Sequence, residues 1–177
     1  RGCRFCQAGY IYRPVRERQP ETIRSLVRQM LRHSGYDEVS LLSLSTGDYS
    51  AIEALVQDLM GCYAVQRVAI SLPSLRVGSL TPELMHEIKK VRKTGFTMAP
   101  EAGSERLRQV INKGICEEDL IASARAAFEL GWRVIKLYFM IGLPTETDAD
   151  LEALVALAEI GPAAKPAVPA IVNALAN

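Results

Sequence analysis

Cysteine and histidine are scarce in this chain of 177 residues, which has four cysteines and two histidines. Four cysteines in a chain of this length do not build the network of disulfides that holds many small secreted domains together. Cys62 and Cys116 each stand alone in the sequence. This cysteine usage leads us to expect a protein of the reducing cytoplasm.

The sequence also lacks long apolar runs and an excess of charge of either sign. No run approaches the ~18 apolar residues that span a bilayer, so we expect no membrane partner. Twenty-one basic residues against twenty acidic ones leave a net charge of +1. This balance excludes a global electrostatic argument for nucleic acid or an anionic surface. The apolar fraction of 49% can fill the core of about one domain.

The chain does have an alternation of two hydrophobic periods. Helical periodicity covers 20–34, 49–60, 81–94, 104–111, 117–130 and 148–160, and short apolar strands cover 39–44, 67–72, 96–99 and 132–141. Strand–helix units of about thirty residues are typical of parallel strands with helical crossovers. Near-continuous apolar strands indicate a sheet that is buried on both faces. The pattern predicts an α/β fold, either a closed barrel or an open doubly wound sheet.

Four loops follow the predicted strands, and ligands of parallel α/β folds bind at the carboxyl ends of strands. These loops are rich in small, polar or acidic residues and cover 45–48, 73–76, 100–104 and 142–146. Glycine and proline could be present there only to make turns. Because three of the four loops also have an acidic residue, we expect a binding site at this edge.

The pair Cys3 and Cys6 has three interpretations. A structural zinc site needs two more cysteines or histidines with their own close spacing, and we expect His33 and His86 on exposed helix faces. A thioredoxin-like dithiol sits at the start of a helix, whereas the next predicted helix begins some fifteen residues later. An iron–sulfur cluster fits if a further ligand lies upstream of this sequence.

Residues 2–9, GCRFCQAG, resemble the end of the CxxxCxΦC loop of radical SAM enzymes, where Φ is aromatic. In that family three cysteines bind a [4Fe–4S] cluster, and S-adenosylmethionine (SAM) chelates the open iron. The resemblance implies that Cys3 and Cys6 are the second and third ligands, with the first cysteine four positions before Cys3. It implies that Phe5 packs near the adenine of SAM, although Phe5 could also simply cover the cluster.

The loop at 45–48 is similar to the Gly-Gly-Glu-type motif, which holds the methionine amino group of SAM. The letters differ from the family, but a small residue is still followed by an acid. The resemblance implies that Gly47 allows close backbone approach and that Asp48 supplies the carboxylate. The alternative for Asp48 is the N-cap of the following helix.

Residues 100–108 resemble the segment after the family's fourth strand, where an amide or acid contacts the ribose and a later basic residue meets the SAM carboxylate. The resemblance gives Glu101 the first role and Lys113 the second, with Arg106 and Arg108 as rivals. Ser104 is also expected to bind the cofactor, or else to cap its own helix.

Residues 136–147, KLYFMIGLPTET, look like the family's fifth-strand motif, which packs its backbone and apolar side chains on adenine. The resemblance implies that Tyr138, Met140 and Gly142 contact the cofactor. Altogether the resemblance covers residues 1–161, and its four segments occur in family order. Residues 162–177, rich in alanine and proline, are expected to form a tail or linker.

The resemblance implies a partial (β/α)6 TIM-like barrel that lacks its first strand and its last. It implies a radical SAM core that cleaves SAM and uses the 5′-deoxyadenosyl radical to abstract hydrogen from an unknown substrate. The expected partner is an electron donor such as flavodoxin or ferredoxin. The segments look most like the cobalamin-binding group with an Elongator-like or methylthiotransferase-like core, so cobalamin in an upstream domain and a tRNA substrate are also expected. The alternative is a zinc- or RNA-binding α/β module without radical chemistry.

Overall fold

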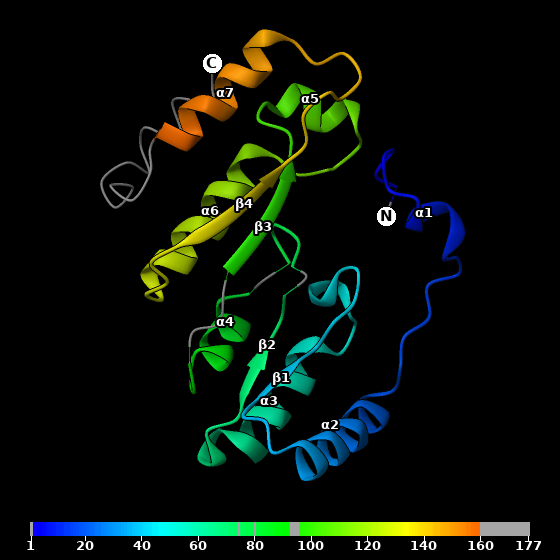
Figure 1. The fold of residues 1–177 in the computed structure, drawn as a ribbon, viewed down its shortest axis with the longest axis vertical. Coiled ribbons are helices and arrows are strands. Elements are labelled where there is room, and N and C mark those ends of the chain that lie inside the picture. Colours follow the sequence, from blue (N-terminus) through cyan, green and yellow to red (C-terminus); the bar gives the residue numbers. More distant parts are fainter. Residues whose placement is uncertain (1, 74, 80, 93–95, 160–177) are drawn as a thin grey trace.

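The computed structural model describes residues 2–73, 75–79, 81–92 and 96–159 (Figure 1). Its regular elements are α1 (Ala8–Ile11), α2 (Pro20–Ser34), β1 (Glu38–Ser40), α3 (Ile52–Tyr63), β2 (Ala69–Ser71), α4 (Pro82–Ile88), β3 (Phe96–Glu101), α5 (Glu105–Val110), α6 (Glu117–Glu129), β4 (Ile135–Phe139) and α7 (Asp148–Glu159). Short 3-10 turns cover Thr46–Asp48 and Ala64–Gln66. The predicted tail at 162–177 lies outside the described residues. The helix predicted for 81–94 is shorter than expected, because α4 ends at Ile88 with Lys89 as its C-cap.

The strands form two parallel pairs. β1 pairs with β2, with Val39 opposite Ile70. β3 pairs with β4, and their register shifts between Met98 and Glu101. Within the described residues these are separate two-stranded sheets, which lie in the lower and upper halves of Figure 1. The α/β class with parallel strands is therefore confirmed, whereas a single continuous sheet is not observed.

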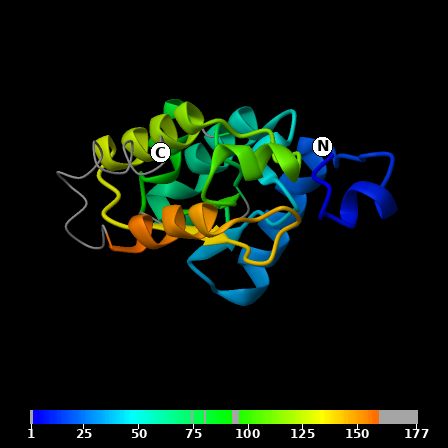
Figure 2. The same ribbon diagram turned by 90° about the horizontal axis from the view of Figure 1, so that it is seen from above.

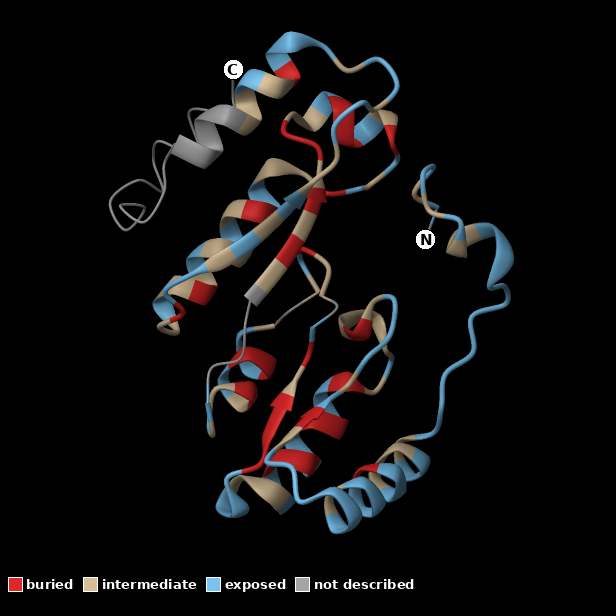
Figure 3. Cartoon of the chain, viewed as in Figure 1, coloured by how far each residue is buried: buried red, intermediate tan, exposed pale blue. Residues whose placement is uncertain are grey.

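The apolar core is divided in the same way (Figure 3). One cluster packs α3 against β1 and β2 and includes Leu55, Leu59 and Ile70. A second packs α6 against the β3–β4 pair around Met98 and Leu120. Each leucine or isoleucine buried in this way contributes about 1.5–3 kcal/mol. A small third cluster, Ala102, Leu107 and Ile111, lies under α5 and supports the loops at the ends of the strands.

Two helix ends agree with the local sequence signals. Gly35 ends α2 with φ +68°, a left-handed conformation that suits glycine. The hydroxyl of Thr81 accepts a hydrogen bond from the N–H of Leu84 at 3.2 Å, which caps α4 as predicted. No helix in the described part of the chain is both long and apolar enough to cross a bilayer.

Several predicted boundaries were wrong. β1 ends at Ser40, so Leu42 and Leu44 are largely exposed. The chain turns back there because the Thr46 hydroxyl donates to the carbonyl of Leu41 at 3.0 Å. α3 begins three residues later than predicted, after the 3-10 turn, and continues through Gly61.

The expectation of strands buried on both faces was wrong for β4. Ile135 and Leu137 pack in the second cluster, whereas Lys136 and Tyr138 on the other face are exposed. The sequence also gave no indication of α1, which begins two residues after Cys6. The thioredoxin-like interpretation of Cys3 and Cys6 was disfavoured because no helix was predicted close after them. The presence of α1 removes this objection. Seen from above in Figure 2, α1 extends from the molecule at the end opposite to α6 and α7.

Candidate functional site

The segment with the two cysteines is fixed to the end of α5. The N–H of Arg4 donates to the carbonyl of Ile111 at 2.9 Å. The side-chain amide of Asn112 donates to the carbonyl of Gly2 at 2.7 Å, and the guanidinium of Arg4 donates to the carbonyl of Val110 at 2.6 Å. Three hydrogen bonds therefore hold residues 2–6 against a segment more than a hundred positions away in sequence.

Cys3 and Cys6 are both free thiols and both half-buried. The N–H of Cys6 donates to the carbonyl of Cys3 at 3.1 Å, so the two residues lie in one tight turn. Two soft sulfur donors on one turn fit part of an iron–sulfur or zinc ligand set. No group of three or more histidine, cysteine or acidic residues suited to a metal is found among the described residues. His33 and His86 are exposed, as predicted.

Phe5, Glu101, Lys113 and Met140, all predicted to bind the cofactor, come together beside this turn. The Lys113 Nζ lies 2.9 Å from the Glu101 Oε1 and 5.6 Å from the centroid of the Phe5 ring. The N–H of Met140 donates to the carbonyl of Glu101 at 2.8 Å, which joins the ends of β3 and β4. The structure thus places a carboxylate, an ammonium group and an aromatic ring next to the two thiols.

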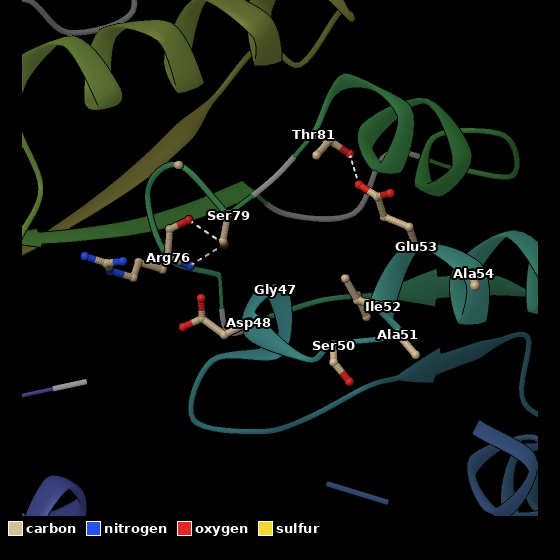
Figure 4. Close-up of a pocket in the computed structure, with 11 residues that line it drawn as sticks. Gly47, Asp48, Ser50, Ala51, Ile52, Glu53, Ala54, Arg76, Ser79 and Thr81 are labelled. Carbon is tan, nitrogen blue, oxygen red and sulfur yellow. Dashed lines mark hydrogen bonds between the residues drawn. The ribbon is translucent and has the colours of Figure 1, made fainter. Parts of the chain in front are cut away.

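Gly47 and Asp48 lie on the rim of a cavity of about 530 Å³ (Figure 4). Asp48 does not cap α3: the Ser45 hydroxyl donates to its Oδ2 at 2.8 Å. A Cβ on Gly47 would lie 2.8 Å from the Cβ of Ser79, so this glycine permits two rim loops to touch. A glycine is therefore needed at this position for packing, which could not be inferred from the sequence.

Arg76 connects this cavity to the loop that carries Lys113. Arg76 lines the cavity, and its guanidinium donates to the carbonyls of Lys113 and Gly114 at 2.9 and 2.6 Å. Arg76 lies in the predicted rim loop at 73–76, of which Ser74 is outside the described residues. The link brings the region around Asp48 into the neighbourhood of the Glu101–Lys113 pair.

Ser104 is occupied by structural contacts. Its hydroxyl accepts from the N–H of Leu107 at 3.2 Å, which caps α5, and it donates to the Asp150 carboxylate. Burial opposes ionisation of Asp150, but hydrogen bonds from Ser104, Thr147 and Arg106 prevail and hold the pKa of Asp150 well below its usual range. The alternative role predicted for Ser104, a helix cap, is therefore confirmed.

Tyr138 and Gly142 flank Met140 at the end of β4. Tyr138 is 59% exposed. Gly142 has φ +84°, and its N–H donates to the carboxylate of Glu146 at 2.5 Å. The glycine and Glu146 therefore form the turn that carries the chain from β4 toward α7.

Both rivals of Lys113 have other partners. Arg106 forms an ion pair with Asp150 at 2.5 Å on the α7 side of α5. Arg108 is fully buried and donates to the carbonyls of Ala102, Gly103 and Ile115 at 2.9–3.2 Å. Burial lowers the pKa of Arg108. Its structural role was missed in the sequence, although it lies next to Leu107 on the buried side of a short amphipathic helix.

The family model of the radical SAM superfamily matches residues 1–158. An uncharacterized protein of Methanocaldococcus jannaschii is 43% identical over 159 residues, which make up 89% of this chain and 34% of that protein. Two tRNA-2-methylthio-N(6)-dimethylallyladenosine synthases are also similar. The one from Desulforamulus reducens is 26% identical over 168 residues and the one from Moorella thermoacetica 25% over 162 residues, each across 85% of this chain.

The alignments cover 34% and 35% of those two synthases, so the chain spans about a third of the length of the curated relatives it matches. The family match, in contrast, covers most of this chain. It also includes both cysteines and the Glu101–Lys113 pair. The chain belongs to the radical SAM superfamily of enzymes.

Proposed function

We propose that this chain is the core of a radical SAM enzyme that binds a [4Fe–4S] cluster through Cys3 and Cys6 and SAM beside it. The observation that carries the proposal is the gathering of Phe5, Glu101 and Lys113 next to the two half-buried thiols. When bound, the cluster and SAM supply a 5′-deoxyadenosyl radical that abstracts hydrogen from substrate. The protein's task is to position the reactants and exclude water.

Each residue has a proposed role toward SAM. Lys113 binds the carboxylate, since its ammonium group lies 5.6 Å from the centroid of the Phe5 ring in the cysteine turn. Glu101 accepts from the ribose hydroxyls, and Asp48 binds the amino group from the far rim. Phe5 covers the adenine. Met140, Tyr138 and Gly142 form the adenine side of the site from the end of β4.

The two parallel pairs are proposed to be consecutive parts of a (β/α)6 barrel. All four strands run parallel within their pairs, and helices alternate with them in sequence. Their outer edges are unpaired within the described residues, and such edges need further strands to cover them. We propose that the remainder of a longer protein supplies these strands.

The substrate is proposed to be a tRNA. Two relatives are named as tRNA-modifying synthases, and their alignments cover 85% of this chain. A flavodoxin or ferredoxin as electron donor, a cobalamin domain upstream and a cytoplasmic location stay predictions from the sequence alone.

The test is metal analysis after anaerobic reconstitution with iron and sulfide, using the whole gene product that contains this chain. We expect four irons and four sulfides per chain and a brown protein, with Cys3→Ser and Cys6→Ser each abolishing the cluster. Cys62→Ser is the matched control, because Cys62 is exposed on α3, away from the turn. A protein that holds one zinc and no sulfide would support the alternative, a zinc-binding module.

A further inference from the structure

The stretch that follows the cysteine turn is unusually exposed. Every residue from 10 to 19 is exposed, including four large apolar side chains. Tyr10 and Tyr12 are 76% and 69% exposed, and Ile11 and Val15 are comparable. Apolar side chains gathered in one exposed segment usually mark a surface that binds something. We call residues 10–18 the tyrosine–arginine segment.

The same segment has a local excess of positive charge. Arg13, Arg16 and Arg18 alternate with the apolar residues. The only acid, Glu17, is occupied: its carboxylate accepts from the N–H of Ser50 at 3.0 Å and from the hydroxyl of Ser50 at 2.5 Å. Arg16 and Arg18 have no ion-pair partner among the residues that the structure describes. The near-neutral charge of the whole chain therefore hides a basic patch.

Both ends of the segment are fixed to the candidate site. At one end the N–H of Gly9 donates to the carbonyl of Cys6 at 3.1 Å. At the other end, the hydroxyl of Tyr49 donates to the carbonyl of Arg18 at 2.8 Å. Tyr49 directly follows Asp48 in the sequence. Burial raises the pKa of Tyr49, and so do Glu17 and Glu21, which keeps its hydroxyl a donor. Figure 1 shows the segment as an extended chain between α1 and α2.

We propose that the tyrosine–arginine segment binds single-stranded RNA and delivers it to the site beside Cys3 and Cys6. Arginines bind the phosphates, and unpaired bases stack on Tyr10 and Tyr12, a combination typical of single-strand recognition. Duplex RNA keeps its bases stacked internally and cannot use the rings. An anionic protein or polyanion would use the arginines but not the rings. The inference rests on the proposed function, because it names the surface that takes the RNA substrate.

The test is fluorescence anisotropy with a fluorescein-labelled single-stranded RNA of mixed sequence, a blunt RNA duplex and heparin as competitor. Tyr10→Ala with Tyr12→Ala is expected to weaken single-strand binding at least tenfold, since stacking on one ring contributes about that factor per base. Tyr10→Phe with Tyr12→Phe retains the rings and is expected to bind like wild type. Arg16→Ala with Arg18→Ala is expected to lower the slope of log K against log salt by about 1.4.

The control variant combines Tyr36→Ala, Arg125→Ala and Arg133→Ala, which removes exposed side chains outside the segment. It is expected to bind RNA like wild type. All the changed residues are exposed, so far-ultraviolet circular dichroism should show an unchanged fold. An equal loss of RNA affinity in the control and segment variants would overturn the proposal. So would duplex or heparin binding that is as tight as single-strand binding and does not depend on the tyrosines.

Iron and sulfide content is measured on the same preparations. A protein that binds RNA through the segment but holds no cluster contradicts the proposed function and supports this inference. A protein that holds the cluster but shows no RNA binding, or shows binding insensitive to the segment, overturns this inference alone.

Discussion

Lys113 and Glu101 form an ion pair across the two ends of α5, with 2.9 Å between Nζ and Oε1. Both side chains are largely shielded, at 13% and 16% exposure. Glu101 has φ +74°, in the left-handed region that residues other than glycine seldom adopt. Such backbone strain persists where surrounding contacts hold it, and it concentrates at functional sites. The pair therefore holds Glu101 in a costly conformation at the end of β3.

Lys113→Met should weaken SAM binding about tenfold or more. The change removes a charge-assisted hydrogen bond of about 1.5–3 kcal/mol. Isothermal titration of reconstituted protein with SAM measures the effect. Lys90→Met is the control, since Lys90 pairs with Glu87 on the surface and is expected to leave affinity unchanged. A Lys113→Met protein that melts earlier but binds SAM normally would assign Lys113 a purely structural role.

Arg108→Met should destabilise the fold by about 2–4 kcal/mol, because the buried carbonyls of Ala102, Gly103 and Ile115 lose their donors. These carbonyls flank Glu101 and Lys113, so SAM affinity should fall as well. Arg125→Met on the exposed face of α6 is the control and should change stability by less than about 0.5 kcal/mol. Urea unfolding measures the stability of both variants. Equal stability of the two variants would show that the buried guanidinium of Arg108 does not stabilise the fold.

Signals that act within a few residues were readable in the sequence. Thr81, Ser104 and Gly35 end or begin helices where their side chains and backbone preferences predict. The α/β class follows from the alternation of hydrophobic periods. The cysteine turn and the Glu101–Lys113 neighbourhood came from a family resemblance, because no local rule brings residues twelve or a hundred positions apart together.

The failures share a physical cause, which is dependence on distant contacts. Leu42 and Leu44 have the pattern of a strand, yet no neighbouring strand pairs with them within the described residues, so they stay exposed. Gly61 has the pattern of a helix end, but the packing of α3 on β2 continues past it. The burial of Arg108 is a tertiary effect that overrides its charge.

Gly47→Ala should destabilise the chain by about 1–3 kcal/mol and disturb the cavity next to Asp48. The new Cβ would meet the Ser79 side chain within 2.8 Å and its carbonyl oxygen at 3.2 Å, so the two rim loops must separate. Gly61→Ala is the matched control: its Cβ meets nothing within 4 Å, and it should stabilise α3 by about 0.5–1 kcal/mol. Thermal unfolding compares them.

Ser79→Gly should rescue part of the loss in a Gly47→Ala background, since it removes the clashing Cβ and Oγ. The rescue is incomplete, because the Ser79 hydroxyl also donates to the Arg76 carbonyl at 2.7 Å. Additive effects of the two changes would contradict direct contact between the loops.

Asp150 should make the protein acid-sensitive. Hydrogen bonds from Ser104, Thr147 and Arg106 outweigh burial and hold the pKa of Asp150 below the usual aspartate value of about 3.9. A lowered pKa in the folded state stabilises the fold above the unfolded pKa, and this contribution is lost as pH falls toward the folded pKa. Wild type should therefore lose stability progressively below about pH 4.

The variant Asp150→Asn tests directly whether Asp150 stabilises the fold at neutral pH and loses this effect in acid. The variant should be less stable than wild type at pH 7 by about 2–3 kcal/mol, because Arg106 and Ser104 lose a charged acceptor. The difference should be constant from pH 7 to about pH 5 and shrink below about pH 4, as wild-type Asp150 becomes protonated. Asp148→Asn, an exposed change in the same first turn of α7, should cost at most about 1 kcal/mol. Urea unfolding across this pH range measures each difference, and parallel curves for wild type and Asp150→Asn would show that Asp150 is not the titrating group.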